Sequence, residues 1–192
     1  MPCFLSIRSL MLLTWHLYMW YDKRKQERTL QMKQQHKLYF PLFVDISQKK
    51  VVIIGGGKIA QRRIETLLVF AEHIYVIAPE VTDPIKELNT QGKIHWIHEA
   101  YRPELLEGAE LVLAATNDPE CNESVVRYCN EKRIPVNTAH KKEACDFFFP
   151  GIARHGNIVA GITANGLNHK EAKKARECIS RALEESGIKK SL

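Results

Sequence analysis

The sequence predicts an α/β protein with a parallel sheet, helices on both faces of the sheet, and a small extension after it. Three observations predict this fold. A run of β-branched residues at 51–54 leads through three glycines into a helical pattern. Short apolar strands and helices then alternate up to residue 138, as in consecutive βαβ units. Beyond that point two strand-like stretches adjoin each other and precede one last helix.

The stretch VVIIGGGKIA at 51–60 matches the G-x-G-x-x-G/A pattern of a dinucleotide-binding turn. Its apolar strand suits burial on both faces. Gly55 makes the turn, Gly57 lets the backbone approach a pyrophosphate, and Ala60 packs the helix against the strand. The helix start offers unpaired N–H groups and a positive dipole end to phosphates. We therefore predict a Rossmann-type domain that binds NAD, and a mere packing turn is the alternative.

The helix after the glycines is predicted from apolar residues at helical spacing, with charged residues on the intervening positions. The apolar positions are Ala60, Ile64, Leu67, Leu68 and Ala71, and the charged ones are Arg62, Arg63 and Glu65.

A second strand is predicted at 74–78, and Pro79 and Glu80 follow it. Glu80 lies near the position where such folds place an acid on the ribose hydroxyls. A carboxylate there disfavours a 2′-phosphate, which favours NAD over NADP. The alternative is that Glu80 is only an acidic residue ahead of the helix predicted at 82–88, which starts with Thr, Asp and Pro.

Three further strands are predicted at 93–99, 111–115 and 134–138. The middle one ends in Thr116 and Asn117, and Asp118 is predicted to cap the next helix, with Pro119 at its first position. Since the carboxyl edge of a parallel sheet faces the cofactor crevice, Thr116 and Asn117 could bind the ribose or nicotinamide. Turn formation alone would equally explain both residues.

Two strand-like stretches at 147–152 and 158–163, joined by a turn at 155–157, predict an extension beyond the sheet. Asn168 is predicted to cap a final helix with Glu171 at its third position. Such an extension cannot bury both of its faces on a single Rossmann unit, so we expect a homodimer. Before the first buried strand, residues 39–46 include a proline and predict an edge strand or a packed arm.

Charge is distributed unevenly along the 192 residues. Residues 1–37 carry seven Lys/Arg and two Asp/Glu, whereas residues 38–192 carry 21 and 20. The net charge of +6 therefore gives no reason to expect a nucleic-acid partner. Residues 3–21 are apolar and precede a basic run. They are interpreted as a start-site artefact upstream of Met32, a membrane anchor, or a disordered or partner-binding leader.

Cysteine and histidine spacing predicts neither a disulfide framework nor a metal site. The five cysteines form no C-x-x-C pair, which indicates reduced thiols in a cytoplasmic protein. His95 and His98 would point to opposite faces of a strand, so they are not expected to share a metal ion.

Five segments in order resemble the precorrin-2 dehydrogenases, including the N-terminal part of sirohaem synthase and the bifunctional dehydrogenase/ferrochelatase. They are YFPLFVDISQKKVVIIGGGKIAQRRIETLL, VIAPE, LVLAATNDPECN, IPVNTA and CDFFFPGIARHGNIVAGITANG. The resemblance implies NAD-dependent oxidation of precorrin-2 to sirohydrochlorin, for sirohaem or cobalamin, by a homodimer with interlocking strands. After the leader at 1–37, the predicted domains are an NAD-binding domain at 38–140 and a dimerisation and tetrapyrrole-binding extension at 141–192.

The resemblance also implies positions for the binding residues. The NAD contacts fall on Lys58, Ile59, Pro79 and Glu80, with Ala115 and Thr116 on the nicotinamide side. Precorrin-2 carries eight carboxylates, and the expected substrate-binding residues are Asn137, Lys141, Arg154 and Lys170, with Lys142 as a further basic candidate.

Two departures from the family pattern affect the expected chemistry. His140 stands where the family has an aspartate, and a neutral imidazole can still accept a proton near pH 7. The serine-rich glycine loop of sirohaem synthase is replaced by TANG at 163–166, and only one helix follows it, whereas many bifunctional members add a helical domain. Dehydrogenation is therefore expected rather than metal insertion.

Two other functions compete with this interpretation. The first is a non-catalytic Rossmann protein that senses NAD or a tetrapyrrole, with His140 marking lost chemistry. The second is an unrelated short-chain oxidoreductase, which is disfavoured because the Y-x-x-x-K spacing of Tyr21 and Lys25 falls in the leader.

Overall fold

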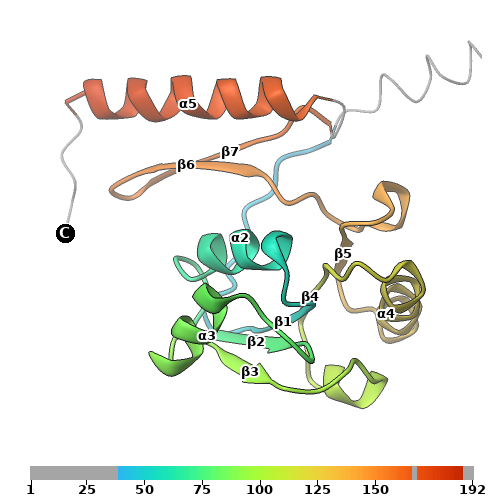
Figure 1. Ribbon diagram of the computed structural model, residues 1–192. Coiled ribbons are helices and arrows are strands. Elements are labelled where there is room, and N and C mark those ends of the chain that lie inside the picture. The colour runs from blue at the N-terminus through green and yellow to red at the C-terminus, as the bar shows by residue number, and fades with distance from the viewer. Residues whose placement is uncertain (1–38, 166–167, 188–192) are drawn as a thin grey trace, which may run out of the picture. The chain divides into compact units, whose positions relative to one another are not determined.

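The computed structural model describes residues 39–165 and 168–187, and residues 41–192 form one compact unit. Its centre is a five-stranded parallel sheet in the order β3-β2-β1-β4-β5 (Figure 1). The strands are β1 Lys50–Ile54, β2 His73–Ile77, β3 His95–Ile97, β4 Leu111–Ala114 and β5 Val136–Thr138. The order reverses between β1 and β4, which is where open α/β sheets bind their ligands.

Helices cover both faces of this sheet, as predicted. One face is covered by α2 Lys58–Leu67 and α3 Asp83–Thr90, and the other by α4 Pro119–Lys132 and the 3₁₀ helix η1 Pro103–Leu106. A second short 3₁₀ helix, η2 Lys142–Ala144, follows β5. The side chain of Asp118 accepts from the backbone N–H groups of Glu120 and Cys121, which confirms the predicted cap of α4.

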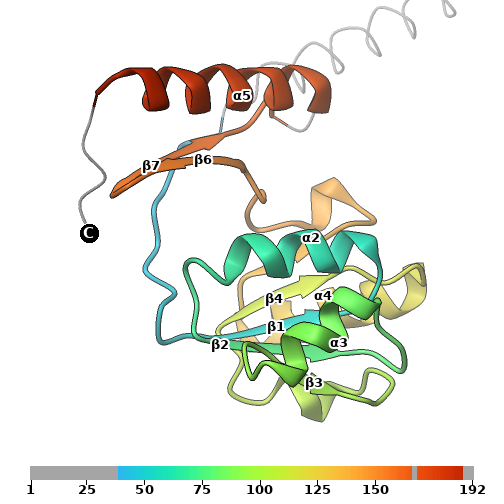
Figure 2. The same cartoon turned by 60° about the vertical axis from the view of Figure 1, so that its left-hand side comes forward.

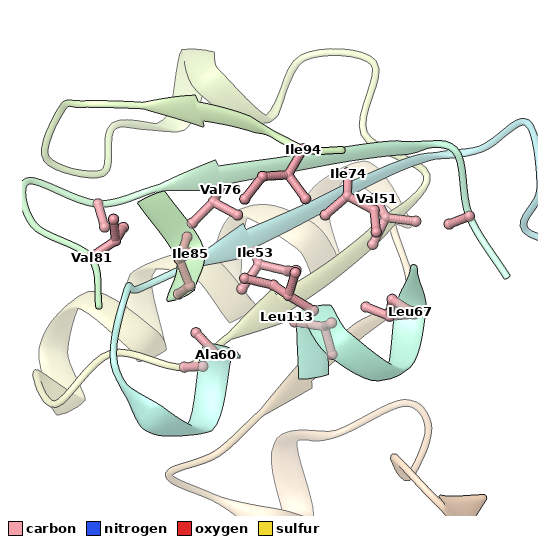
Figure 3. Packing of buried hydrophobic residues seen from close by; sticks show 14 residues of the cluster. Val51, Ile53, Ala60, Leu67, Ile74, Val76, Val81, Ile85, Ile94 and Leu113 are labelled. Atoms are coloured by element: carbon pink, nitrogen blue, oxygen red, sulfur yellow. The ribbon is translucent and has the colours of Figure 1, made fainter. Parts of the chain in front are cut away.

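The first strand supplies the core on both sides of the sheet. Val51 and Ile53 belong to the cluster on the α2 side, whereas Val52 and Ile54 belong to the cluster on the α4 side, and all four are almost fully buried. Figure 3 shows Ala60 and Leu67 of α2 in the first of these clusters. The β-branched run before the glycines is therefore the central strand that its composition predicts.

The extension consists of the antiparallel hairpin β6 Gly151–His155 and β7 Ile158–Ile162, and of the helix α5 His169–Glu185. Figures 1 and 2 both show α5 running along the hairpin. The side chain of Asn168 accepts from the N–H groups of Lys170 and Glu171 at 3.1 Å, as predicted for a cap. No residue of α5 is buried.

Several predicted boundaries were wrong. Residues 39–46 form no strand, and only Ile46 of this range packs partly against the cluster on the α2 side. Leu42 and Phe43 are 76% and 72% exposed, since no neighbouring strand lies beside them and Pro41 cannot donate to a ladder. The strand predicted at 93–99 contains only three residues, and the hairpin begins at Gly151 rather than at residue 147.

The predicted leader at 1–37 lies outside the described residues. Among the residues that are described, no helix combines the length and the apolar character needed to cross a membrane.

Candidate functional site

The loops that follow four of the parallel strands meet at one edge of the sheet. Backbone hydrogen bonds of 2.8–3.0 Å join these loops to their neighbours. The bonds run from Gly55 N to Ile77 O, from Ala115 N to Ile54 O, from Ala139 N to Ala114 O and from Thr82 N to Gly56 O. The edge therefore brings together the glycine turn, Pro79 and Glu80, Ala115 and Thr116, and the segment that begins at Ala139.

Two of the three glycines are required by the fold itself. Gly55 has a φ of +111°, and a Cβ atom there would lie 2.5 Å from the backbone oxygen of Ala115. A Cβ atom at Gly56 would meet the backbone oxygen of Glu80 and lie 2.6 Å from a methyl group of Val81. The glycine turn approaches the loops after β2 and β4 so closely that neither Gly55 nor Gly56 has room for a side chain.

Gly57 is different, because no packing within the described protein accounts for it. Its φ of −83° suits any residue, and a Cβ atom there would meet nothing within 4 Å. Gly57 is the N-cap of α2, no side chain caps this helix, and its first turn contains no acidic residue. The open space in front of the helix N–H groups fits the pyrophosphate of a dinucleotide.

Four other residues predicted to bind the cofactor lie in α2 and in the loop after β2. Lys58 and Ile59 occupy the first turn of α2 and are exposed, and Pro79 and Glu80 are exposed in the loop after β2. Glu80 precedes Thr82, the N-cap of α3, so it lies outside the first turn of that helix. The sheet edge thus brings together the glycine turn and Glu80, which was predicted to bind the ribose.

After β4, the polar side chains bond mainly to each other. The hydroxyl of Thr116 lies 2.9 Å both from Oδ1 of Asn122 and from the carbonyl oxygen of Asp118. Nδ2 of Asn122 donates to the carbonyl oxygen of Thr116 at 3.0 Å, and Asn122 is buried. The hydroxyl of Thr116 therefore bonds within the turn after β4. Asn122 was not predicted, although its helical spacing to the buried Val125 and Cys129 could have indicated it.

His140 lies two residues beyond β5, at the same sheet edge as the glycine turn, and its side chain is exposed. The neighbouring Lys141 is 3.9 Å from a carboxylate oxygen of Glu123. Nζ of Lys142 donates to the backbone oxygen of Asn165 at 2.5 Å. His140, the candidate proton acceptor, and Lys141, a candidate for binding substrate carboxylates, thus lie at this edge. The ammonium group of Lys142 instead bonds to the loop before α5.

The remaining predicted substrate residues lie elsewhere. Asn137 is 4% exposed within β5, and its Nδ2 donates to the backbone oxygen of Phe147 at 2.7 Å. Arg154 pairs with Val159 next to the tip of the hairpin, and Lys170 lies in the first turn of α5. The sheet edge therefore collects His140 and Lys141, but not Arg154 or Lys170.

Burial governs the pKa values of the groups near β5. Desolvation raises the pKa of the Cys145 thiol, although the N–H group of Thr138 and the guanidinium of Arg63 oppose that rise. Desolvation also lowers the pKa of the Arg63 guanidinium. Among the described cysteines none forms a disulfide, and no cluster of metal-binding side chains occurs in the same residues.

Comparison with known proteins also identifies an NAD(P)-binding domain in this chain. A family model described as "Putative NAD(P)-binding" matches residues 42–151. The "Probable multifunctional siroheme biosynthesis protein HemA" of Ruminiclostridium josui is 39% identical over 165 residues, which are 83% of this chain and 32% of that protein. "Siroheme synthase 1" of Pectobacterium atrosepticum is 32% identical over 145 residues, 76% of this chain and 30% of that protein. The chain thus spans about a third of these relatives.

A solved structure agrees with the fold. The "SirC, precorrin-2 dehydrogenase" structure matches with a TM-score of 0.67 and 25% identity, over 74% of this chain and 70% of that one. The five-stranded sheet, the glycine turn and the family match lead to one conclusion: this chain belongs to the family of NAD(P)-binding domains found in precorrin-2 dehydrogenase SirC and at the N-terminus of siroheme synthase.

Proposed function

We propose that this protein is an NAD-dependent dehydrogenase that oxidises precorrin-2 to sirohydrochlorin. The single observation that carries the proposal is the open space at Gly57, in front of uncapped N–H groups at the sheet edge that also holds His140. Relatives named as siroheme synthases and as a precorrin-2 dehydrogenase support the choice of substrate.

The proposed cofactor site has two parts. The backbone N–H groups at the start of α2, at Lys58 and Ile59, would bind the pyrophosphate. Glu80 would accept hydrogen bonds from the adenosine ribose and would repel a 2′-phosphate, which makes NAD the preferred cofactor. Bound NAD supplies a hydride acceptor at C4 of its nicotinamide ring.

The reaction removes a hydride and a proton from precorrin-2, and the protein must provide for the proton. The exposed imidazole of His140 can accept it at the sheet edge. Lys141 lies beside it and can attract a substrate carboxylate, because its contact with Glu123 is long and solvent-exposed. Arg154 and Lys170 would then contact outer carboxylates from the extension, in this protomer or in its partner.

A homodimer is part of the proposal. α5 is amphipathic but none of its residues is buried, and Ala175 and Ala182 on its apolar stripe are exposed. The only buried residue of the described hairpin is Ala153. A two-stranded sheet with one helix rarely buries enough apolar surface to be stable alone, so a second copy would complete the extension.

The direct test mixes purified protein with precorrin-2 and NAD without oxygen and follows the absorbance of sirohydrochlorin and NADH. Both products should form in equal amounts. His140→Ala should reduce turnover by about 10²-fold or more while NAD binding is kept, and His140→Asp should retain turnover because a carboxylate can also accept a proton.

The alternative is a non-catalytic sensor, which the histidine at position 140 favours. Such a protein would bind NAD or sirohydrochlorin with ordinary affinity but form no NADH from precorrin-2 at any enzyme concentration. Equal turnover of the wild type and His140→Ala would instead keep the dehydrogenase and remove His140 from its mechanism.

A further inference from the structure

The side chain of Arg63 is partly enclosed between α2 and the segment 145–149 that joins β5 to the hairpin. Its guanidinium carbon lies 5.6 Å from the ring centroid of Phe149. Phe147 and Phe149 both pack against the apolar cluster on the α2 side of the sheet. Nη1 of Arg63 is fully buried and bonds to no described residue. An arginine with this environment is not an ordinary residue of a solvent face.

Arg63 also has no carboxylate partner among residues 39–165 and 168–187, because none of the ion pairs found there includes it. Removal from water lowers the pKa of its guanidinium; the nearby Cys145 thiol opposes this shift, and the charge of Arg62 adds to it. A guanidinium that is desolvated without a counter-ion is unfavourable, and proteins usually pair such a group. The unpaired state therefore calls for an anion that the described protein does not supply.

A second unmatched group borders the same segment. Oδ1 of Asn137 is fully buried and has no hydrogen-bond partner among the described residues, although its Nδ2 donates to Phe147. Asn137 is paired in register with Leu113, which packs on the α2 side of the sheet. Reciprocal bonds between Asp146 and Val136 fix this segment along β5. The segment that encloses Arg63 is thus held in place along β5.

We propose that Arg63 is a substrate-binding residue whose guanidinium receives one carboxylate of the polyanionic substrate, with the ring of Phe149 behind it. This inference rests on the proposed dehydrogenase function. Nε and Nη2 are not fully enclosed, so they can face a carboxylate in the paired geometry that arginine favours. Arg63 lies roughly 7.5 Å along α2 from Lys58, so one helix would serve both phosphate and substrate.

Arg62 offers a matched control, because it is the neighbouring arginine on the same helix and is exposed. We expect Arg63→Gln to weaken binding of sirohydrochlorin, an available polycarboxylate, by roughly 10- to 100-fold. The KM for precorrin-2 should rise in parallel, with kcat changed by less than about threefold. Arg62→Gln should change each value by less than about twofold, and neither variant should alter the affinity for NAD.

Thermal unfolding separates this role from a structural one. Arg63→Met should raise Tm by about 2–4 °C, since it removes an unpaired charge from a desolvated site, whereas Arg62→Met should leave Tm unchanged. A lower Tm with an unchanged KM would mean that Arg63 only supports the fold, and would overturn the proposal.

The outcomes also separate this inference from the proposed function. If the wild type binds sirohydrochlorin through Arg63 but never oxidises precorrin-2, the binding role of Arg63 is supported and the proposed dehydrogenase function is wrong. If the wild type oxidises precorrin-2 and Arg63→Gln binds sirohydrochlorin as tightly as Arg62→Gln does, only the proposed binding role of Arg63 is wrong. Failure of the wild type to bind sirohydrochlorin overturns both.

Discussion

Gly55 and Gly57 are two residues apart in one turn, but the packing of the protein excludes a side chain only at Gly55. Alanine at Gly55 would need a φ of +111° and would place its Cβ 2.5 Å from a backbone oxygen. We expect Gly55→Ala to lower the free energy of unfolding by roughly 2–4 kcal/mol. Gly57→Ala should change it by less than about 1 kcal/mol, because that Cβ meets nothing and the φ is ordinary.

Urea titration of both variants at one pH checks this prediction. An equal loss of stability at the two positions would contradict the structural distinction between a glycine required by packing and a glycine required by a ligand.

In the proposed cofactor site, Glu80 would set the preference for NAD over NADP. Glu80→Gln removes the charge that would repel a 2′-phosphate while keeping a hydrogen-bonding side chain. We expect the ratio of the dissociation constants for NADP and NAD to fall at least about fivefold, measured by calorimetry. An unchanged ratio would leave Glu80 as a loop residue ahead of α3.

At the scale of single residues, the sequence predicted what depends on local spacing. The glycine pattern and the Asp118 cap are of this kind, and both are found in the structure. The surroundings of Arg63 could not be predicted, because its enclosing wall comes from Phe149, more than eighty residues later in the chain. Position 63 lies at the border of the apolar stripe of α2, where spacing leaves burial undecided.

Among the elements, strand lengths depended on partners rather than on composition. β3 pairs only with β2, over Tyr75 to Ile77, so the apolar pattern at 93–99 exceeds the available ladder. The apolar residues at 40–44 have strand-like composition but no adjacent strand, and they remain exposed. Pairing is a property of the assembled sheet, and a single sequence does not reveal it.

The helix α4 carries a buried thiol that makes stability depend on alkaline pH. Burial raises the pKa of Cys129 to about 12, from an ordinary value near 9. The unfolded chain loses this proton at lower pH than the folded protein, so stability is complete below pH 9 and falls as pH rises towards 12. The expected slope from this thiol is about −1.4 kcal/mol per pH unit.

Cys129→Ala should therefore flatten the fall of unfolding free energy between pH 9.5 and 11, measured by urea titration at several pH values. Tyr101, whose pKa burial also raises to about 12, should contribute a further fall above pH 10 in both proteins. Replacing the exposed Cys178 by alanine serves as the control and should leave the slope as it is. Identical slopes for all three proteins would contradict the buried-thiol account.

At the scale of the whole molecule, the alternation of strands and helices predicted the Rossmann-type sheet. The extension was predicted as two strands and a helix, and this is confirmed. Its incomplete burial in one chain is the observation behind the proposed dimer, and spacing along the chain does not reveal how two copies would pack.

The dimer can be tested on α5. Ala175→Glu with Ala182→Glu places charges on exposed positions of its apolar stripe, so the monomer should still fold while self-association is lost. Sedimentation equilibrium should give about twice the 22.1 kDa chain mass for the wild type and the chain mass for the variant. Lys174→Glu, an exposed position off that stripe, controls for added negative charge, and a monomeric wild type would contradict the dimer.

The central claim is that the head of α2 at this sheet edge binds a dinucleotide. Calorimetric titration of NAD into the wild type and into Gly57→Ala at two temperatures tests it most directly. The wild type should give saturable heat, and Gly57→Ala should bind NAD at least tenfold more weakly with an unchanged Tm. Equal affinities, or no heat from the wild type at either temperature, would contradict it.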